Sequence, residues 1–457
     1  MTTSPTAPPA LTARAHTRAL LTLGLPLIGS HLAQFAITVT DTLMIGWYDV
    51  TALAALTVAG GIYFVAFIVG SGFAWAVMPM VASAAGTEDD RQVRRVTRMG
   101  LWLSIGFGAA VMPVMVFSEP LLLAMGQEAE VARLGALYLQ VAGLGIIPNL
   151  LIMCLKSYLA ALERTQVVLW VTLASAALNV VLNYALIFGN WGAPEMGIVG
   201  AAIASVTLQV AGVIALVAYA AWATPEYQLF RNFQRPDWPA MGRVFRLGWP
   251  IGLTNLAEVG LFAASSILVG WIGVRELAAH GIALQITSAT FMVHIGLSQA
   301  VTVRAGRAYG QRDEPGLRLG AGVGLAISLI YAFATIVVFL TMPEPLIRLF
   351  LSPDDPALTE VLVIGAALLA VAAVFQFVDG AQVLTLGMLR GVQDTGVPMV
   401  MAVVSYWGVG MPASYVFGFV LGWGAVGVWA GLVVGLALAG VLFSVRFWGR
   451  SARISPV

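Results

Sequence analysis

Twelve long apolar stretches follow one another along the chain, and short charged or Pro- and Gly-containing segments separate them. A helix crosses the roughly 30 Å hydrocarbon core of a membrane with about 20 apolar residues, so each stretch is long enough to span. Because the runs are continuous and do not alternate with polar residues, a transmembrane β-barrel is excluded. The pattern predicts an all-α integral membrane protein with twelve transmembrane helices. They lie near residues 20–46, 53–78, 96–118, 132–155, 165–189, 197–222, 246–272, 278–301, 317–342, 358–389, 396–421 and 424–447.

The composition excludes a soluble protein and several kinds of site. Of the 457 residues 60% are hydrophobic and only 10% are charged, whereas soluble domains carry roughly 25% charged residues. A net charge of +1 gives no electrostatic reason to expect nucleic acid as a partner. The single cysteine, Cys154, excludes an intramolecular disulfide and a cysteine-based metal cluster. The four histidines fit no HExxH spacing, so we expect no enzyme activity and no cofactor.

The positive charges orient the predicted helices. Twenty of the 23 Lys and Arg residues fall at the two ends of the chain or in even-numbered loops, and only Arg133, Arg275 and Arg348 fall in odd-numbered loops. Loops rich in Lys and Arg stay on the cytoplasmic side. We therefore expect both termini to be cytoplasmic.

The two halves of the chain repeat each other. At an offset of 224 residues, positions 23–26 (LGLP) fall on 247–250 (LGWP), and positions 45–47 (IGW) fall on 269–271 (VGW). Each repeat holds six predicted spans, an even number, so both have the same orientation. This predicts two six-helix lobes related by a pseudo-two-fold axis along the membrane normal, with a substrate cavity between them.

The repeat divides the chain into five parts. The predicted parts are a cytoplasmic N-terminal tail (1–19), an N-lobe (20–222), a cytoplasmic linker (223–245), a C-lobe (246–447) and a cytoplasmic C-terminal tail (448–457).

Three acidic residues fall inside predicted spans: Asp41, Glu258 and Asp379. No Lys or Arg is expected at the same depth. An unpaired charge at mid-bilayer costs at least about 2.5–3.5 kcal/mol. We therefore expect these carboxyl groups to hold a proton or a cation.

Each acid continues a polar stripe on its helix. The stripes are His31, Gln34, Thr38 and Asp41; Asn255 and Glu258; and Gln376, Asp379 and Gln382, while the fifth span carries Asn179 and Asn183 at a helical spacing of four. Carboxylate and amide oxygens suit H⁺ or Na⁺. We expect Asp41 to face Asn179 and Asn183, and Glu258 to face Asp379 across the C-lobe. His31, Gln34, Thr38, Asn255 and Gln382 are candidates for a substrate or proton network.

These residues form a recognisable set. The motifs are Pro26…Gln34…Asp41-Thr42…Gly46, Leu178-Asn179-x-x-x-Asn183-Tyr184, Gly197-x-x-Gly200-Ala201-Ala202-x-Ala204-Ser205, Pro250…Glu258 and Asp379-x-x-Gln382…Leu389-Arg390-Gly391-x-x-Asp394-Thr395. With them the chain resembles a multidrug and toxic compound extrusion (MATE) transporter over essentially its whole length. Acids in both lobes are similar to the NorM-like bacterial branch of that family.

The resemblance implies an antiporter of the bacterial inner membrane that expels amphipathic, often cationic, drugs in exchange for H⁺ or Na⁺ by alternating access of two lobes. It implies an N-lobe cation region of Asp41, Asn179, Asn183 and Ser205 and a C-lobe site of Glu258 and Asp379, with no metal beyond Na⁺ at these positions. The expected partners are drugs, the coupling cation and membrane lipids, and the expected state is a monomer. One position departs from the pattern: Phe375 stands where Na⁺-driven members carry a tyrosine.

Two other functions compete with this reading. A flippase for lipid-linked precursors should carry basic residues inside its cavity, and no Lys or Arg lies away from the ends of a predicted span. An intramembrane enzyme needs a nucleophile, a metal site or an aspartyl pair; the sequence shows neither HExxH nor a GxSxG serine element, and the acids lie on distant helices.

Overall fold

The computed structural model describes residues 12–351 and 358–454. In these residues it is almost entirely helical, and twelve helices or helix runs are long and apolar enough to cross a membrane. The predicted number of spans is confirmed.

The N-terminal half contains α1 (Ala13–Tyr48), α2 (Val50–Gly86), α3 (Asp90–Val116), α4 (Ser118–Ala124), α5 (Ala129–Ala142), η1 (Gly143–Gly145), α6 (Ile146–Ala161), α7 (Thr165–Phe188), η2 (Asn190–Gly192) and α8 (Gly197–Ala223). After the short turn η3 (Pro225–Tyr227), the C-terminal half contains α9 (Trp238–Ile272), α10 (Val274–Gly310), α11 (Glu314–Thr341), α12 (Pro343–Arg348), α13 (Leu358–Gly391), α14 (Gly396–Val403), η4 (Val404–Gly410), α15 (Met411–Tyr415), η5 (Val416–Val420), α16 (Gly424–Arg446) and η6 (Phe447–Ser451).

Two of the spans are built from several pieces. The fourth span runs through α5, η1 and α6, and the eleventh runs through α14, η4, α15 and η5. In the eleventh span η4 and η5 are π-helical. Pro412 has no N–H to donate to the carbonyl group one turn earlier, which interrupts the α-helical ladder and favours the wider turns.

The helices at the start of each half are longer than predicted. α1 begins at Ala13, where the Thr12 hydroxyl accepts a hydrogen bond from the N–H of Ala15 (3.3 Å), so part of the predicted tail is helix. α9 begins at Trp238, where the Asp237 carboxylate caps the N–H of Ala240 (3.2 Å). The predicted linker 223–245 is correspondingly shorter. The predicted tails lie partly outside the described residues, and η6 extends the last helix to Ser451.

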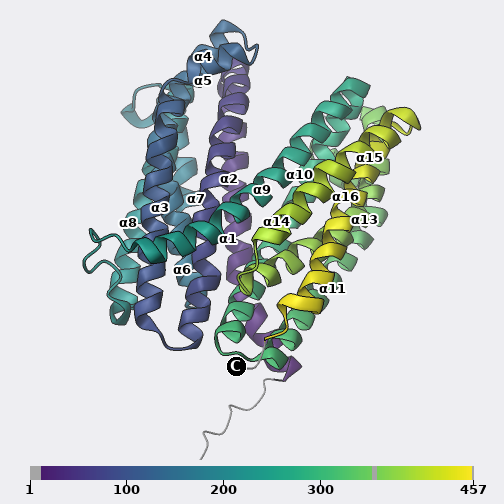
Figure 1. Ribbon diagram of the computed structural model, residues 1–457. Helices are drawn as coiled ribbons and strands as arrows, with labels where there is room; N and C mark the ends of the chain where they lie inside the picture. Colours follow the sequence, from purple (N-terminus) through teal and green to yellow (C-terminus); the bar gives the residue numbers. More distant parts are fainter. Residues whose placement is uncertain (1–11, 352–357, 455–457) are drawn as a thin grey trace, which may run out of the picture.

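The helices form two lobes, α1–α8 and α9–α16 (Figure 1). The lobes stand apart at the end that carries α4 and meet at the opposite end, so the molecule is V-shaped. Helices at equivalent places have similar lengths, and α2 and α10 both have 37 residues. Across the closed end α1 packs against α10, and α2 packs against α9 and α10.

Glycine brings α2 and α9 close together at the closed end. A Cβ atom on Gly72 would lie 2.4 Å from the carbonyl oxygen of Gly248 and 2.4 Å from the nitrogen of Gly252. No side chain fits between backbones at that separation. These three glycines therefore allow the two lobes to meet backbone to backbone.

Candidate functional site

In the N-lobe, Asp41 of α1 lies between two amides of α7. One oxygen of Asp41 accepts hydrogen bonds from the Nδ2 atoms of Asn179 (2.8 Å) and Asn183 (2.6 Å). Both asparagines are fully buried, and their Oδ1 atoms have no hydrogen-bond partner among the described residues. The spacing of four on α7 and the position of Asp41 on α1 produce the expected contact. Because both amide nitrogens donate to Asp41, the two amide oxygens remain available to a cation.

The other members of the predicted α1 stripe face elsewhere. Thr38 lines a cavity against the C-lobe, and His31 lies beside Gln299 of α10. Gln34 is exposed. Ser205 of α8 makes no side-chain hydrogen bond to the Asp41 group in the part of the chain that the structure describes. The polar residues that share one face of α1 therefore divide between two neighbours. Asp41 contacts α7, whereas Thr38 and His31 face the C-lobe.

A second polar cluster of the N-lobe was not anticipated. The hydroxyl of Tyr63 on α2 accepts hydrogen bonds from Asn149 of α6 (3.2 Å) and Gln209 of α8 (3.3 Å). The internal repeat gave one signal for it, because Asn149 falls on Asp379 at an offset of 230 residues. The same position therefore carries a neutral amide in one lobe and a carboxyl group in the other.

In the C-lobe, Glu258 of α9 and Asp379 of α13 lie close enough to interact electrostatically. Asp379 is 2% exposed. Oxygen Oε1 of Glu258, Oδ1 of Asp379 and Oε1 of Gln382 are buried and have no hydrogen-bond partner among the described residues. A buried polar atom without a partner is costly, so a cluster of such oxygens indicates a place for a proton or a small cation.

The amides beside Asp379 are held by neighbouring helices. Gln382 donates to the hydroxyl of Tyr406 in η4 (2.5 Å), and Gln376 donates to the hydroxyl of Thr290 in α10 (2.7 Å). Phe375 offers no oxygen, and its ring packs edge-on against Trp429. Tyr406 was missed at the sequence level.

Arg390 corrects one expectation. We expected no basic residue at the depth of the acids, but α13 continues to Gly391 and holds Arg390 inside the protein, 6% exposed. Its Nη2 donates to Oδ1 of Asn255 (2.7 Å), one turn before Glu258, and it lies within electrostatic range of Glu258. Its guanidinium carbon lies 5.0 Å from the ring centroid of Trp75 on α2, across the lobe boundary. Lys156 likewise lies within a helix, α6.

Two buried histidines of α10 are occupied by hydrogen bonds. Nδ1 of His280 accepts from the indole N–H of Trp429 (2.9 Å), and Nε2 lies 2.9 Å from the hydroxyl of Ser266. With Nδ1 as an acceptor, the ring is neutral and its hydrogen lies on Nε2. His294 bonds Ser328 through Nδ1 (2.9 Å). His280 therefore acts as a packing group.

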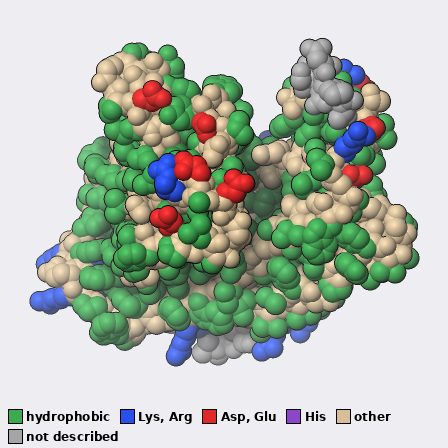
Figure 2. All heavy atoms as spheres, turned by 90° about the horizontal axis from the view of Figure 1, so that it is seen from above, with side chains coloured by type: hydrophobic (Ala, Val, Ile, Leu, Met, Phe, Trp, Pro, Cys, Tyr) green, Lys and Arg blue, Asp and Glu red, His purple; other side chains and the backbone are tan. Residues whose placement is uncertain are grey.

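A cavity of about 740 Å³ lies between the lobes. Its walls are apolar and carry no charged side chain, with a few hydroxyl and amide groups. It is lined by Phe35, Thr38, Val39, Thr42 and Leu43 of α1, by Gln285, Ile286, Ala289 and Thr290 of α10, by Tyr331, Ala334, Thr335, Val338 and Phe339 of α11, and by Leu346, Leu349 and Phe350 around α12. Seen from the open end, the molecule is hollowed between the lobes and carries acidic side chains on its rim (Figure 2).

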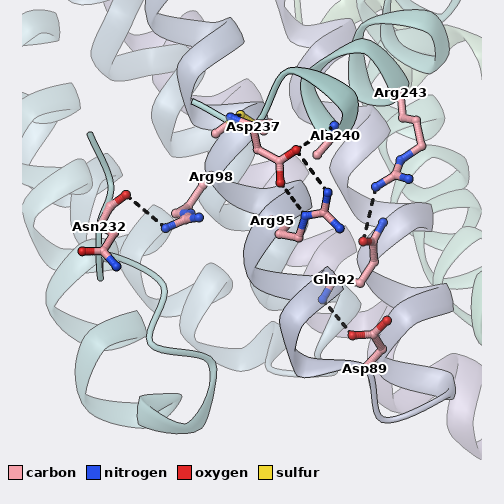
Figure 3. A network of polar contacts seen from close by, with 9 residues as sticks. Asp89, Gln92, Arg95, Arg98, Asn232, Asp237, Ala240 and Arg243 are labelled. Carbon is pink, nitrogen blue, oxygen red and sulfur yellow. Dashed lines mark hydrogen bonds and ion pairs between the residues drawn. The ribbon is translucent and has the colours of Figure 1, made fainter. Parts of the chain in front are cut away.

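The chain segment between the lobes is fastened to α3 at a clamp formed by Arg95, Arg98, Asn232 and Asp237 (Figure 3). Arg95 pairs with the Asp237 carboxylate through two hydrogen bonds, of which Nη2 to Oδ1 is 3.1 Å. Nη1 of Arg98 donates to the carbonyl oxygen of Asn232 (3.2 Å). The residue that caps the first helix of the C-lobe is thus held by the N-lobe.

Known proteins resemble this chain over nearly its full length. The profile of the MatE family matches residues 26–185 and 250–416. The "Probable multidrug resistance protein NorM" of Rhizobium meliloti (strain 1021) is 46% identical over 96% of this chain and 95% of the relative, and that of Agrobacterium fabrum is 44% identical over 94% and 93%.

Solved structures share the fold. A structure described as the "Outward-facing conformation of a multidrug resistance MATE family transporter of the MOP superfamily" matches with a TM-score of 0.85 at 20% identity, over 95% of each chain. Twelve spanning helices, two lobes and the match to the family profile lead to one conclusion. The chain belongs to the MatE family and is a multi-pass membrane protein.

Proposed function

We propose that the protein is a secondary active multidrug efflux antiporter of the bacterial inner membrane, with both termini in the cytoplasm. It exports amphipathic, often cationic, compounds and takes up protons in exchange. One observation carries the proposal: each lobe holds a carboxyl group within a spanning helix together with buried oxygens that have no partner among the described residues, and an apolar cavity lies between the lobes. The names of the relatives, which describe multidrug resistance, support the same function.

The apolar cavity suits the hydrophobic part of an amphipathic drug. Such compounds partition into membranes. The cavity offers them hydroxyl and amide groups but no charged side chain, so it does not impose a single orientation on the bound drug. The positive charge of the drug is attracted by the carboxylates behind the cavity walls. Drug and coupling cation then compete for the same negative charge, and this reciprocity is what antiport requires.

In the C-lobe we propose the proton as the coupling ion. Two neighbouring carboxyl groups cannot both stay ionised at little cost, and one shared proton relieves the repulsion. The Arg390 guanidinium supplies a resident positive charge nearby, which disfavours a further metal cation. Phe375 adds no oxygen ligand.

In the N-lobe the Asp41 group offers one carboxylate and two amide oxygens. These residues fit either H⁺ or Na⁺, and Na⁺ there would be held by Asp41, Asn179 and Asn183. Asp41→Asn preserves the shape of the side chain and removes the charge. It should abolish coupled efflux while leaving thermal unfolding nearly unchanged.

Efflux from proteoliposomes with proton and Na⁺ gradients imposed separately tests the proposal. Drug export should follow an inward proton gradient at fixed Na⁺, and Glu258→Gln and Asp379→Asn should each reduce it strongly. Export that depends only on a Na⁺ gradient at fixed pH would replace the proton by Na⁺. Wild-type export by both single variants would remove the C-lobe from the coupling mechanism.

Impermeant labelling tests the orientation. A cysteine in place of Glu195, in the turn between α7 and α8, should react from outside in a variant without Cys154. A cysteine in place of Arg235, in the segment between the lobes, should react only from the cytoplasm. The reverse pattern would invert the membrane orientation.

A flippase for lipid-linked phosphates is not favoured. Such a lipid needs basic groups where its phosphates lie, and no Lys or Arg lines the cavity. Arg390 is occupied by Asn255 and Trp75.

A further inference from the structure

One tyrosine of the C-lobe is buried between the two helices that carry the coupling carboxyl groups. Tyr406 lies in η4, the π-helical segment of the eleventh span, and its side chain is fully buried. Its phenol lies within electrostatic range of both Glu258 on α9 and Asp379 on α13. Short π-helical segments are frequent at functional sites because their wider turn redirects side chains.

Two hydrogen bonds fasten η4 to the two acid-bearing helices. Gln382, one turn after Asp379 on α13, donates its Nε2 hydrogen to the Tyr406 hydroxyl (2.5 Å). The next residue, Trp407, donates its indole hydrogen to the carbonyl oxygen of Ala257 (3.0 Å), and Ala257 immediately precedes Glu258. The phenol is therefore positioned by side chains and backbone that also position the carboxyl groups.

The direction of the Gln382 bond decides what the phenol can do. Since the phenol oxygen accepts from an amide N–H, its own hydrogen is available to donate. Glu258 and Asp379 each keep one buried oxygen without a partner among the described residues. A phenol donates more readily to a carboxylate than to a neutral carboxylic acid, because a hydrogen bond to an ionised group is about twice as strong.

We propose that Tyr406 is a positioning residue of the C-lobe coupling site and donates its hydroxyl hydrogen to the carboxylate that has released its proton. This proposal rests on the proposed coupling function. The phenol stabilises the ionised state of the Glu258–Asp379 pair after proton release, and it thereby sets how easily the proton leaves. In this role the Tyr406 hydroxyl donates a hydrogen bond, whereas a tyrosine at position 375 would offer its oxygen to Na⁺. The two positions also lie on different helices.

Tyr406→Phe removes one oxygen and keeps the ring. Without the donor, the ionised pair is less stable, so the carboxyl groups should take up protons at higher pH. The midpoint of the pH dependence of drug binding should move upward by about one pH unit, a roughly tenfold change in proton affinity that matches one hydrogen bond to a charged group. Tyr415→Phe, at the exposed end of the same span, is the matched control and should leave the midpoint unchanged.

The charged and titratable groups that face this pair are Arg390 from α13, Tyr406 from η4 and His294 from α10, which lies against Gly380. Measuring the pH midpoint of drug binding again in a Glu258→Gln, Asp379→Asn background tests whether Tyr406 acts through these two carboxyl groups. There Tyr406→Phe should have no further effect on the midpoint, because its partners have been removed.

Three results are distinguishable. An unchanged midpoint in Tyr406→Phe, with coupled efflux still lost in Glu258→Gln and Asp379→Asn, overturns this inference and leaves the proposed function standing. Wild-type efflux in both acid variants removes the C-lobe from the coupling mechanism and overturns this inference with it. A midpoint shift that persists in the doubly neutralised background shows that Tyr406 acts through another group and overturns the assignment. Thermal unfolding of Tyr406→Phe in detergent verifies that the variant is folded.

Discussion

Glu163, in the turn after α6 of the N-lobe, forms an ion pair with Arg307 at the end of α10 in the C-lobe, and their charged atoms lie 3.1 Å apart. The same Glu163 oxygen lies 3.5 Å from Nη1 of Arg304. Arg307 also donates to the carbonyl oxygen of Ala161 (3.4 Å). These bonds join the lobes at the closed end, and alternating access requires that they break.

We therefore expect Glu163→Gln to shift the protein toward the state that is open at this end. The three side chains are 19–36% exposed, and partly exposed ion pairs contribute about 0.5–1 kcal/mol. The expected shift in the ratio of the two states is roughly two- to five-fold. Distances between spin labels on α6 and α10 measure this ratio.

Glu130→Gln is the matched control for that change. Glu130 pairs with Arg133 within one helix, α5, at 2.7 Å, and does not join the lobes. The ratio of states should stay at the wild-type value in this variant. Equal shifts in both variants would show that the ratio of states responds to the loss of any negative charge and not to the contact between the lobes.

Gly72→Ala tests the close approach of α2 and α9. The added methyl group would lie 2.4 Å from backbone atoms of Gly248 and Gly252, and backbone cannot rotate away as a side chain can. Overpacking of this kind costs about 1–3 kcal/mol. Closure at this end of the molecule should be disfavoured and efflux reduced, as measured by cross-linking across that end and by transport. Gly60→Ala on the same helix, where nothing lies within 4 Å of the added atom, should behave as wild type.

The clamp between α3 and the start of α9 predicts a pH-dependent loss of stability. The hydrogen bonds from Arg95 lower the pKa of Asp237 below its ordinary value, which is about 3.9 in an unfolded chain. A lowered pKa in the folded protein means that the stabilisation is complete above the ordinary value and is lost as the pH falls through the lowered one.

Asp237→Asn keeps the helix cap and removes the ion pair. At pH 7 it should lower the free energy of unfolding by about 1 kcal/mol, and the difference from wild type should shrink as the pH falls through the lowered pKa of Asp237. Thermal unfolding in detergent across this range measures both. Asp313→Asn makes the same change at an equivalent cap on α11 and should show a smaller loss. If the difference in unfolding free energy stayed constant as the pH was lowered, it would not depend on the ionisation of Asp237.

The features that depend on local patterns along the chain could be predicted from the sequence. The spans and their number follow from the length of continuous apolar stretches, and the contact of Asp41 with Asn179 and Asn183 follows from residues three and four apart on regular helices. Tyr406 does not, because the π-helical turns around it shift the face on which each side chain lies. Arg390 was assigned to a loop because it follows an apolar run, and only its contacts with Asn255 of α9 and Trp75 of α2 place it inside the protein. The cavity needs the tertiary arrangement of α1, α10 and α11, which no single segment encodes.

Arg390 provides the last prediction, because it contacts both lobes. Its guanidinium bonds Asn255 at 2.7 Å and lies over the Trp75 ring of the opposite lobe. Arg390→Gln removes the positive charge that partly balances Glu258 and leaves Asn255 without its donor. A buried acceptor without a partner costs about 1–3 kcal/mol, and a desolvated cation–π contact contributes up to about 2 kcal/mol.

We therefore expect Arg390→Gln to lower the thermal unfolding midpoint and to reduce coupled efflux. Arg390→Lys keeps the charge but loses the planar group that lies over Trp75, so it should recover part of the efflux and little of the stability. Trp75→Leu separates the two roles further, because it removes the contact between lobes and leaves the charge beside Glu258. It should change the ratio of inward- to outward-facing states while proton dependence stays near wild type. If Trp75→Leu altered proton dependence as much as Arg390→Gln, the charge and the contact between lobes would have to be treated as a single unit.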